Sequence, residues 1–569
     1  MYIGDSANLS LLQVIRRVVH DSLGPCAFIG DPFRHFMVEE TPLEAGAGWL
    51  WQMARQTPAK PSMAEAEYLL SWYRRSTSSL LDLYDESELG RPLRQWLQTP
   101  DARLGEKATD PVFFLLLALG AQSCPEDRDE RADQYFNFGR LLSTAAVMED
   151  PSISTVHAHV LMTLYLLSAS RRNAAFMYLG LAVRAAYALG IHRADINSVF
   201  APAEYAERER AWKVLRVLDM FMSSSLGRPP ATSETRDTSA EPTYSASNDL
   251  CSIFESTLSE VYLQRLVSLD TLERLSERHR LWAERCTAGL GLGGIPATEF
   301  VESPDGGGGG GREPNIGLCL LKQSYYGSIM LLARPSLVDA VSSAGNLDGG
   351  NCNSNSNSTH PSPSPSAMVH ACVDSAVQTI GLLRGLLDAG ARVPKRLPFV
   401  INSLFVSAQV LGLAFFGDLD DRFPLDRSLK DAQRLLALFA EHDAVARRDL
   451  AIVRNLDEAC NAYVDRRTRR RMEQQSTLIG SLFGTLHPAS SAPSPPSASA
   501  ATATAGFTEG ADLTSPDTGF ASMPTSTLAD DATISPRAVL FGSSDQDVPL
   551  FYATGESELG GMSLVDGRW

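Results

Sequence analysis

The chain has 569 residues, a net charge of −17 and 44% hydrophobic residues. This length is enough for several domain-sized units, and the apolar content is enough to fill a large core. The acidic balance excludes binding to the phosphate backbone of nucleic acid through overall charge, so any DNA contact would need a local basic patch.

The N-terminal segment, Met1 to Arg17, lacks a basic stretch followed by an apolar core, so it does not have the pattern of a secretory signal. The most apolar run that we recognise, Val112 to Ala121, is about half the ~20 residues that a membrane span needs. We therefore expect an intracellular, soluble protein that does not contact a membrane.

Helical patterns dominate the chain. Pro61, Ser62 and Glu65 are typical of a capping box and predict a helix that runs to about Leu81. Apolar residues recur at steps of three and four in two later stretches: Phe176, Leu179, Val183 and Ala186, and Val369, Cys372, Ala376, Ile380, Leu383 and Leu387. No convincing alternation of apolar and polar residues marks a strand, so we predict an all-α, multi-helical fold.

Three polar segments interrupt this pattern, at residues 232–248, 303–313 and 345–366. We predict that they are disordered insertions between helices that still pack together. Residues 474–569 are rich in Ser, Pro and Ala and then acidic and aromatic, which predicts a disordered C-terminal tail. The predicted organisation is one all-α domain over residues 1–473, followed by this tail.

The eight cysteines are scattered, and no two of them are separated by only two residues. A zinc cluster needs thiolates brought together by such short spacings. We therefore expect no cofactor in this chain, and we expect the cysteines to act as small apolar residues in a reducing compartment.

A helix that ends at Gly227 combines charged residues with the bulky Trp212. Glu207, Arg210 and Asp219 would lie near a core, where each charge needs a partner. The partners that the sequence offers are His192, Arg193 and Arg228. We predict a charge network that locks two helices together; the alternative, a pocket for a small-molecule inducer beside this helix, has no direct support in the sequence.

Several such motifs together resemble the fungal-specific transcription factor domain. The resemblance covers roughly residues 1 to 465 and includes A-x-x-L-G-x-H-R at Ala186–Arg193, a charged, tryptophan-containing helix that leads to G-R-P, and a Tyr-Tyr helix that ends in R-P. The matching residues, which we expect to be mainly structural, are Gly190, His192, Arg193, Glu207, Arg210, Trp212, Asp219, Gly227, Arg228, Pro229, Tyr325, Tyr326, Arg334 and Pro335.

This resemblance implies a helical regulatory domain of a transcriptional regulator, for a gene set in secondary metabolism or nutrient use. A two-zinc cluster and a dimerising coiled coil normally precede the domain in that family, so zinc would belong to this protein only if such a cluster lies upstream. The implied partners are the transcription machinery or coactivators, a DNA-binding partner or a second copy, and a small-molecule inducer. We expect no direct, specific DNA binding by this chain.

Two alternatives remain open. One is a co-regulator that reaches promoters only through a partner protein. The other is an all-α enzyme or small-molecule carrier, but the enzyme motifs that we tested fail. Asp418–Asp421 resembles an acidic magnesium site, yet its second element, which begins at Asn248, has Ser256 where a carboxylate is needed. His157 and His159 point to different sides of a helix and would make a poor metal pair.

The chain has one strong basic cluster, formed by Arg466, Arg467, Arg469, Arg470 and Arg471. One interpretation is the end of a helix, where cations complement the dipole. The other is a nuclear import signal, which implies a nuclear protein with a cytoplasmic pool. The cluster is too small to recognise a DNA sequence by itself.

The end of the tail interleaves acidic residues with Leu550, Phe551, Tyr552, Leu559 and Trp569. This pattern resembles an amphipathic activation segment, whose apolar residues bind a coactivator groove while the acids keep it soluble. An inert solubilising tail is the alternative.

Overall fold

A computed structural model describes residues 2–30, 57–77, 80–99, 111–146, 150–238, 244–264, 268–292, 295–298, 300–302, 312–343, 364–388 and 393–484. The chain divides into two compact units, one formed by Met1–Tyr463 with Pro536–Trp569 and the other by Val464–Ser535. The tail residues predicted to form an activation segment lie outside the described residues.

The described part of the chain is almost entirely helical, which confirms the predicted all-α fold. Its N-terminal half contains α1 (Asn8–Leu23), α3 (Met63–Thr77), α4 (Glu86–Gln98), α5 (Pro111–Ser123), α6 (Asp129–Ala146), α7 (Ile153–Ser168), α8 (Arg172–Ala188), α9 (Ala194–Asn197) and α10 (Pro202–Leu226). Then come α11 (Ala246–Ser256), a π-helix (Thr257–Leu263), α12 (Leu269–Thr287), α13 (Ile316–Ser342), α14 (Pro365–Asp388), α15 (Pro398–Phe416), α16 (Leu425–Phe439) and α17 (Ala444–Phe483).

One short antiparallel ribbon departs from the predicted absence of strands. β1 (Phe300–Glu302) pairs with β2 (Arg312–Pro314) on either side of the glycine-rich segment. The predicted insertion at 303–313 therefore ends in a strand, and residues 303–311 lie outside the described residues. In the same way the predicted insertion at 345–366 runs into the start of α14, and its residues up to 363 are not described.

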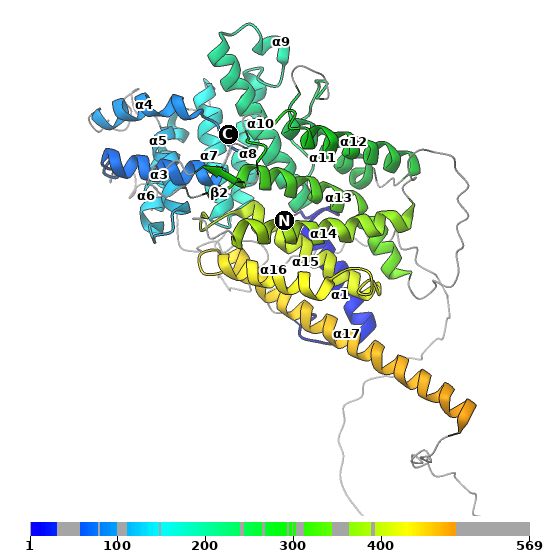
Figure 1. The fold of residues 1–569 in the computed structure, drawn as a ribbon. Helices are drawn as coiled ribbons and strands as arrows, with labels where there is room; N and C mark the ends of the chain where they lie inside the picture. Colours follow the sequence, from blue (N-terminus) through cyan, green and yellow to red (C-terminus); the bar gives the residue numbers. More distant parts are fainter. Residues whose placement is uncertain are drawn as a thin grey trace, which may run out of the picture. The chain divides into compact units, whose positions relative to one another are not determined.

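The core of the first unit is built from helices that are apolar on all sides. α5 and α15 have no polar face, so neighbouring helices cover them all round. In the sequence-coloured ribbon of Figure 1, α13, α14, α15 and α16 follow one another as a packed group, and α1 contacts α15 although the two lie at opposite ends of this unit's sequence.

By length and composition alone, α13, α14 and α15 could cross a membrane. This corrects the expectation that no apolar stretch of the chain is long enough for a membrane span. The most apolar windows of these helices are 67%, 50% and 89% buried. In α15, therefore, protein already covers nearly all of the apolar surface.

The local sequence signals around α3 (Met63–Thr77) predict its start correctly but not its end. The Ser62 hydroxyl accepts a hydrogen bond from the backbone nitrogen of Glu65, as the capping pattern predicts. The helix then ends at Thr77, before the predicted Leu81. Gly190 follows α8 with a φ of +69°, a left-handed conformation that glycine adopts readily after a helix end.

The helix expected to end at Arg334-Pro335 instead continues to Ser342. A proline inside a helix leaves the carbonyl four residues earlier without its usual donor. Here that carbonyl belongs to Leu331, and the Tyr262 hydroxyl in the π-helix donates to it at 2.8 Å. The vacated hydrogen bond is thus replaced, and the helix passes through the proline.

The last helix, α17, corrects two predictions. It continues to Phe483, so residues 474–483 are helical and do not belong to the predicted disordered tail. The cluster from Arg466 to Arg471 lies inside this helix and not at its C-terminus, so the dipole interpretation of the cluster is wrong. Arg469, Arg470 and Arg471 are exposed.

Candidate functional site

The central helix α10 carries the densest set of buried charges among the described residues. It begins with Pro202 at its first position and ends at Gly227, whose φ of +69° ends the helix. Glu209, Trp212, Arg216 and Asp219 recur on it at steps of three and four, so they share one face.

The polar segment after α10 folds back against this face. Asp219 is fully buried, and its Oδ2 accepts hydrogen bonds from the backbone nitrogens of Ala231 (2.9 Å) and Thr232 (2.6 Å) and from the Thr232 hydroxyl (2.6 Å). Burial nevertheless raises the pKa of Asp219 above its usual range. The prediction of a disordered insertion from residue 232 is therefore wrong for residues 232–238 and 244–248, which the structure describes.

Glu234 lies at the centre of the arrangement, with only 2% of its side chain exposed. Its Oε2 accepts hydrogen bonds from the Trp212 indole nitrogen at 3.1 Å and from the Asn248 side chain at 3.0 Å. The Nε of Arg216 lies 3.9 Å from the same oxygen. One carboxylate thus connects α10, α11 and the segment between them.

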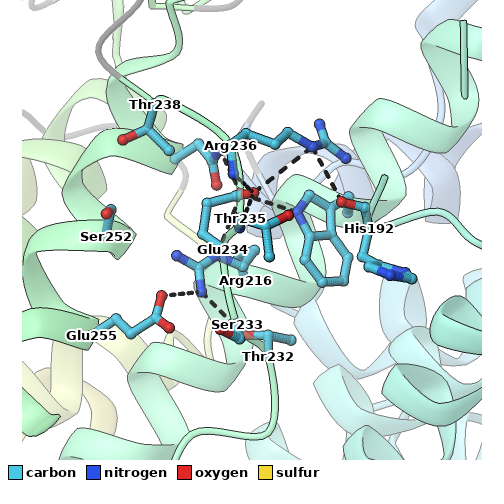
Figure 2. A network of polar contacts seen from close by, with 12 residues as sticks. His192, Arg216, Thr232, Ser233, Glu234, Thr235, Arg236, Thr238, Ser252 and Glu255 are labelled. Atoms are coloured by element: carbon cyan, nitrogen blue, oxygen red, sulfur yellow. Dashed lines mark hydrogen bonds and ion pairs between the residues drawn. The ribbon is translucent and has the colours of Figure 1, made fainter. Parts of the chain in front are cut away.

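Arg216 is the most deeply buried cation of the group, with a fully buried side chain. Its Nη1 donates to Glu255 at 2.7 Å and contacts the Thr232 hydroxyl at 3.4 Å, as Figure 2 shows. Its Nε and Nη2 make no hydrogen bond to described residues. Arg216 therefore depends on the nearby carboxylates to compensate its charge.

Arg236 joins the same segment to the loop after α8. It donates to both carboxylate oxygens of Glu209, at 3.1 and 2.8 Å, and to the backbone carbonyls of Ile191 (3.0 Å) and His192 (3.2 Å). Figure 2 shows Arg236 and Glu234 side by side above Arg216. We call Glu209, Trp212, Arg216, Glu234, Arg236, Asn248 and Glu255 the α10 network.

The charge network exists, but the partners expected from the sequence are wrong. His192 contacts the rings of Tyr187 and Trp212, and its pKa is lowered by burial and by Arg193 and Arg236. Arg193 pairs with Asp195 at the surface.

Arg228 also lies outside the network. It donates to the side chain of Asn173 at 2.7 Å, and its guanidinium lies over the Phe176 ring.

The other two charged residues of the motif lie in a second cluster. Arg210 donates to both carboxylate oxygens of Glu88 at 2.7 Å. Glu207 approaches the buried His157, whose Nδ1 is 3.7 Å from the carboxylate and 2.9 Å from the Tyr84 hydroxyl. Burial, together with nearby Glu88, raises the pKa of Glu207.

The remaining motif residues are dispersed. Gly227 packs against the backbone of Gly4, and Pro229 is exposed. Tyr325 stacks on Trp282 and contacts Tyr326 edge-on. Arg334 donates to the backbone carbonyl of Ser6 at 3.0 Å.

The residues considered for enzyme chemistry have separate partners. His159 Nδ1 bonds to the carbonyl of Thr155, not to a group shared with His157. Asp418 accepts a hydrogen bond from Tyr463, and Asn248 belongs to the α10 network. Among the described residues, no group of three His, Cys, Asp or Glu side chains could hold a metal ion.

Sequence reasoning missed Glu209, Arg216, Glu234, Arg236 and Glu255. Two of them could have been found, because Glu209 and Arg216 share the helical face of Trp212 and Asp219. The other three could not, since only the tertiary fold brings them to α10.

The α10 network lies within the part of the chain that matches a known family. Residues 81–280 match the family described as "Fungal specific transcription factor domain". The chain carries a fungal-specific transcription factor domain. This match confirms the resemblance inferred from the motifs between Gly190 and Pro229, and it runs from α4 into α12.

Similar proteins carry names of the same kind. Over 486 residues the chain is 21% identical to "Filamentous growth regulator 27" of Candida albicans, covering 80% of this chain and 59% of that protein. Over 189 residues it is 30% identical to "Transcription factor asqA" of Emericella nidulans, covering 31% of this chain and 33% of that protein. The chain thus spans less than two thirds of these relatives.

The buried side chains of His157 and His279 should make the stability of the folded chain sensitive to acid. Burial and nearby Arg210 lower the pKa of His157 to about 3, and burial lowers that of His279 to about 4. The unfolded chain takes up these protons first, so the stability they contribute is complete above pH ~6.5 and is lost as pH falls towards ~4. We expect each to cost about 2 kcal/mol of unfolding free energy at pH ~5.

Urea unfolding at neutral pH and near pH 5 tests this effect with a His279→Gln variant. His279 Nδ1 donates to the Leu275 carbonyl, and Nε2 lies 2.9 Å from the Ser328 hydroxyl, which also contacts the Tyr325 carbonyl. The variant should lose about 2 kcal/mol less than the unmodified chain over this interval. The raised pKa of Asp219 makes the protein more stable as pH falls, which opposes the effect of the histidines. Both proteins contain Asp219, so its contribution cancels in the comparison. Equal losses in the two proteins would contradict the assignment.

Proposed function

We propose that this chain is the regulatory part of a fungal transcriptional regulator and is not an enzyme. The observation that carries the proposal is the match of residues 81–280 to the fungal-specific domain, with the α10 network inside it. Each carboxylate of that network faces a guanidinium, an amide or an indole N–H, so none is left as a general acid or base. This arrangement supports a structural role for the α10 network, which holds neighbouring helices together.

The proposed activity is control and recruitment. The acidic-aromatic residues around Phe551 would bind coactivators, and the exposed arginines Arg469 to Arg471 would support nuclear import. The 569 residues contain no C-x2-C pair, so promoter contact would come from a zinc cluster upstream of Met1 or from a DNA-binding partner. The regulated gene set would lie in secondary metabolism or nutrient use.

A tethering experiment tests this function. The 569-residue chain fused to an unrelated DNA-binding domain should activate a reporter above the level of that DNA-binding domain alone. Removal of residues 501–569 should abolish activation while immunoblots show equal protein. A silent full-length fusion that is expressed and nuclear would contradict the proposal of an activator, and undiminished activity without residues 501–569 would contradict recruitment by the tail.

A further inference from the structure

A cavity of about 90 Å³ lies within the first unit, between α10, α11, α13 and α15. Its wall on α13 follows one face of the helix, from Gln323 through Gly327 and Met330 to Arg334. A helical rise of ~1.5 Å per residue separates the backbones of Gln323 and Arg334 by roughly 17 Å. A small volume spread along such a length describes a narrow cavity.

The middle of the cavity is apolar. Large side chains from all four helices line it, namely Met220, Phe221, Phe254, Met330, Phe399 and Val406. Several other polar residues of the wall already have partners: Asn8 donates to Asn402 at 2.8 Å, and the Ser224 and Ser324 hydroxyls donate to carbonyls of their own helices. These groups therefore need no hydrogen bond from a ligand.

Arg334 is different, because it is a buried cation with a single hydrogen bond. It is 3% exposed, and only its Nη1 is bonded, to the carbonyl of Ser6 at 3.0 Å. Its Nε lacks a hydrogen-bond partner, and Arg334 forms no ion pair with a carboxylate of the described residues. The carboxylate of Asp5 acts electrostatically on the same Tyr262 hydroxyl as Arg334 but is not paired with Arg334. A buried charge without a counter-charge is costly, so an anion at this end would be stabilised.

Gln323 is the second unsatisfied polar group of the wall. It is 1% exposed, and its Oε1 has no hydrogen-bond donor among the described residues. Leaving a buried acceptor unpaired costs free energy that a ligand donor can recover. A ligand along this face of α13 would therefore need a hydrogen-bond donor near Gln323 and an anionic group near Arg334.

We propose that this cavity binds a slim, mainly apolar monocarboxylate, with its carboxylate on Arg334 and its chain directed towards Gln323. A second hydrogen-bond donor at the far end of the chain would strengthen binding through Gln323. This inference goes beyond the proposed function and does not rest on it, because binding is measurable without any promoter or coactivator.

Calorimetry with the 569-residue chain tests the charge requirement. Octanoate should bind at one saturable site and raise the melting temperature, while octan-1-ol should bind about tenfold more weakly or worse. 8-Hydroxyoctanoate should bind more tightly than octanoate, and a Gln323→Leu variant should remove that advantage. Equal binding of acid and alcohol, or no saturable binding of octanoate, would overturn the proposal.

A cavity-filling variant tests the location. A Cβ added at Gly327 meets no atom within 4 Å, so Gly327→Leu should occupy the cavity without disturbing the backbone. Gly180→Leu on α8 is the matched control, because a Cβ there also meets nothing within 4 Å and Gly180 does not line the cavity. Loss of octanoate binding in the first variant and retention in the second are expected; undiminished binding by a folded Gly327→Leu protein would contradict the site.

Discussion

Replacing Glu234 with alanine is expected to lower the free energy of unfolding by roughly 3–5 kcal/mol. The change removes the acceptor for Trp212 and Asn248 and takes a negative charge away from Arg216. Arg216 is fully buried, so water cannot replace what it loses. Urea unfolding followed by circular dichroism and tryptophan fluorescence measures the loss.

An exposed glutamate provides the control for Glu234. Glu284 pairs with Arg280 one turn away on α12, with 59% of its side chain exposed. Glu284→Ala should change stability by no more than about 0.5 kcal/mol. Similar losses for the two variants would show that the α10 network contributes no more than a surface ion pair.

The second large effect is expected from Gly227→Ala. A Cβ at Gly227 would lie 2.4–2.5 Å from backbone atoms of Gly4, and the φ of +69° disfavours any side chain. Adding the left-handed backbone cost to the overpacking cost gives about 2–5 kcal/mol of destabilisation. The backbone N–H of Gly4 also donates a hydrogen bond to the Leu226 carbonyl, so the segment before α1 should separate from α10 and become sensitive to proteases.

Gly180→Ala is the counterpart of this substitution. Gly180 lies inside α8, and a Cβ there meets no atom within 4 Å. Alanine should therefore stabilise the protein by roughly 0.5–1 kcal/mol through helix propensity. If Gly227→Ala proved as harmless as Gly180→Ala, the close approach of Gly4 and Gly227 would not constrain the fold.

The sequence predicted the helical fold well because helix formation is signalled locally. The stripe from Val369 to Leu383 is buried as expected, and the Ser62 cap and Gly190 behave as their chemistry predicts. The helix through Pro335 was not predictable in this way. Its replacement donor, Tyr262, lies in a π-helix far upstream, and no local pattern near Pro335 reveals it.

The α10 network shows a second limit of prediction from local sequence, because a polar segment that was expected to be disordered is ordered. Thr232 to Thr238 looks like a solvated loop because its composition is polar, and composition does not show where hydrogen-bond partners lie. Arg236 finds its partners at Glu209 and Ile191, which only the return of the chain onto α10 brings close. A polar segment can be ordered when another part of the fold supplies the complementary charges.

The early residues of the chain have consequences for the order in which the protein can fold during synthesis. Asn8 bonds to Asn402, and its carbonyl accepts from Gln409, 401 residues later. Ser6 likewise contacts Arg334. Helices α3 to α8 can pack on one another as they leave the ribosome, but α1 must wait for α15, so final docking of the N-terminus is a late, high-contact-order step.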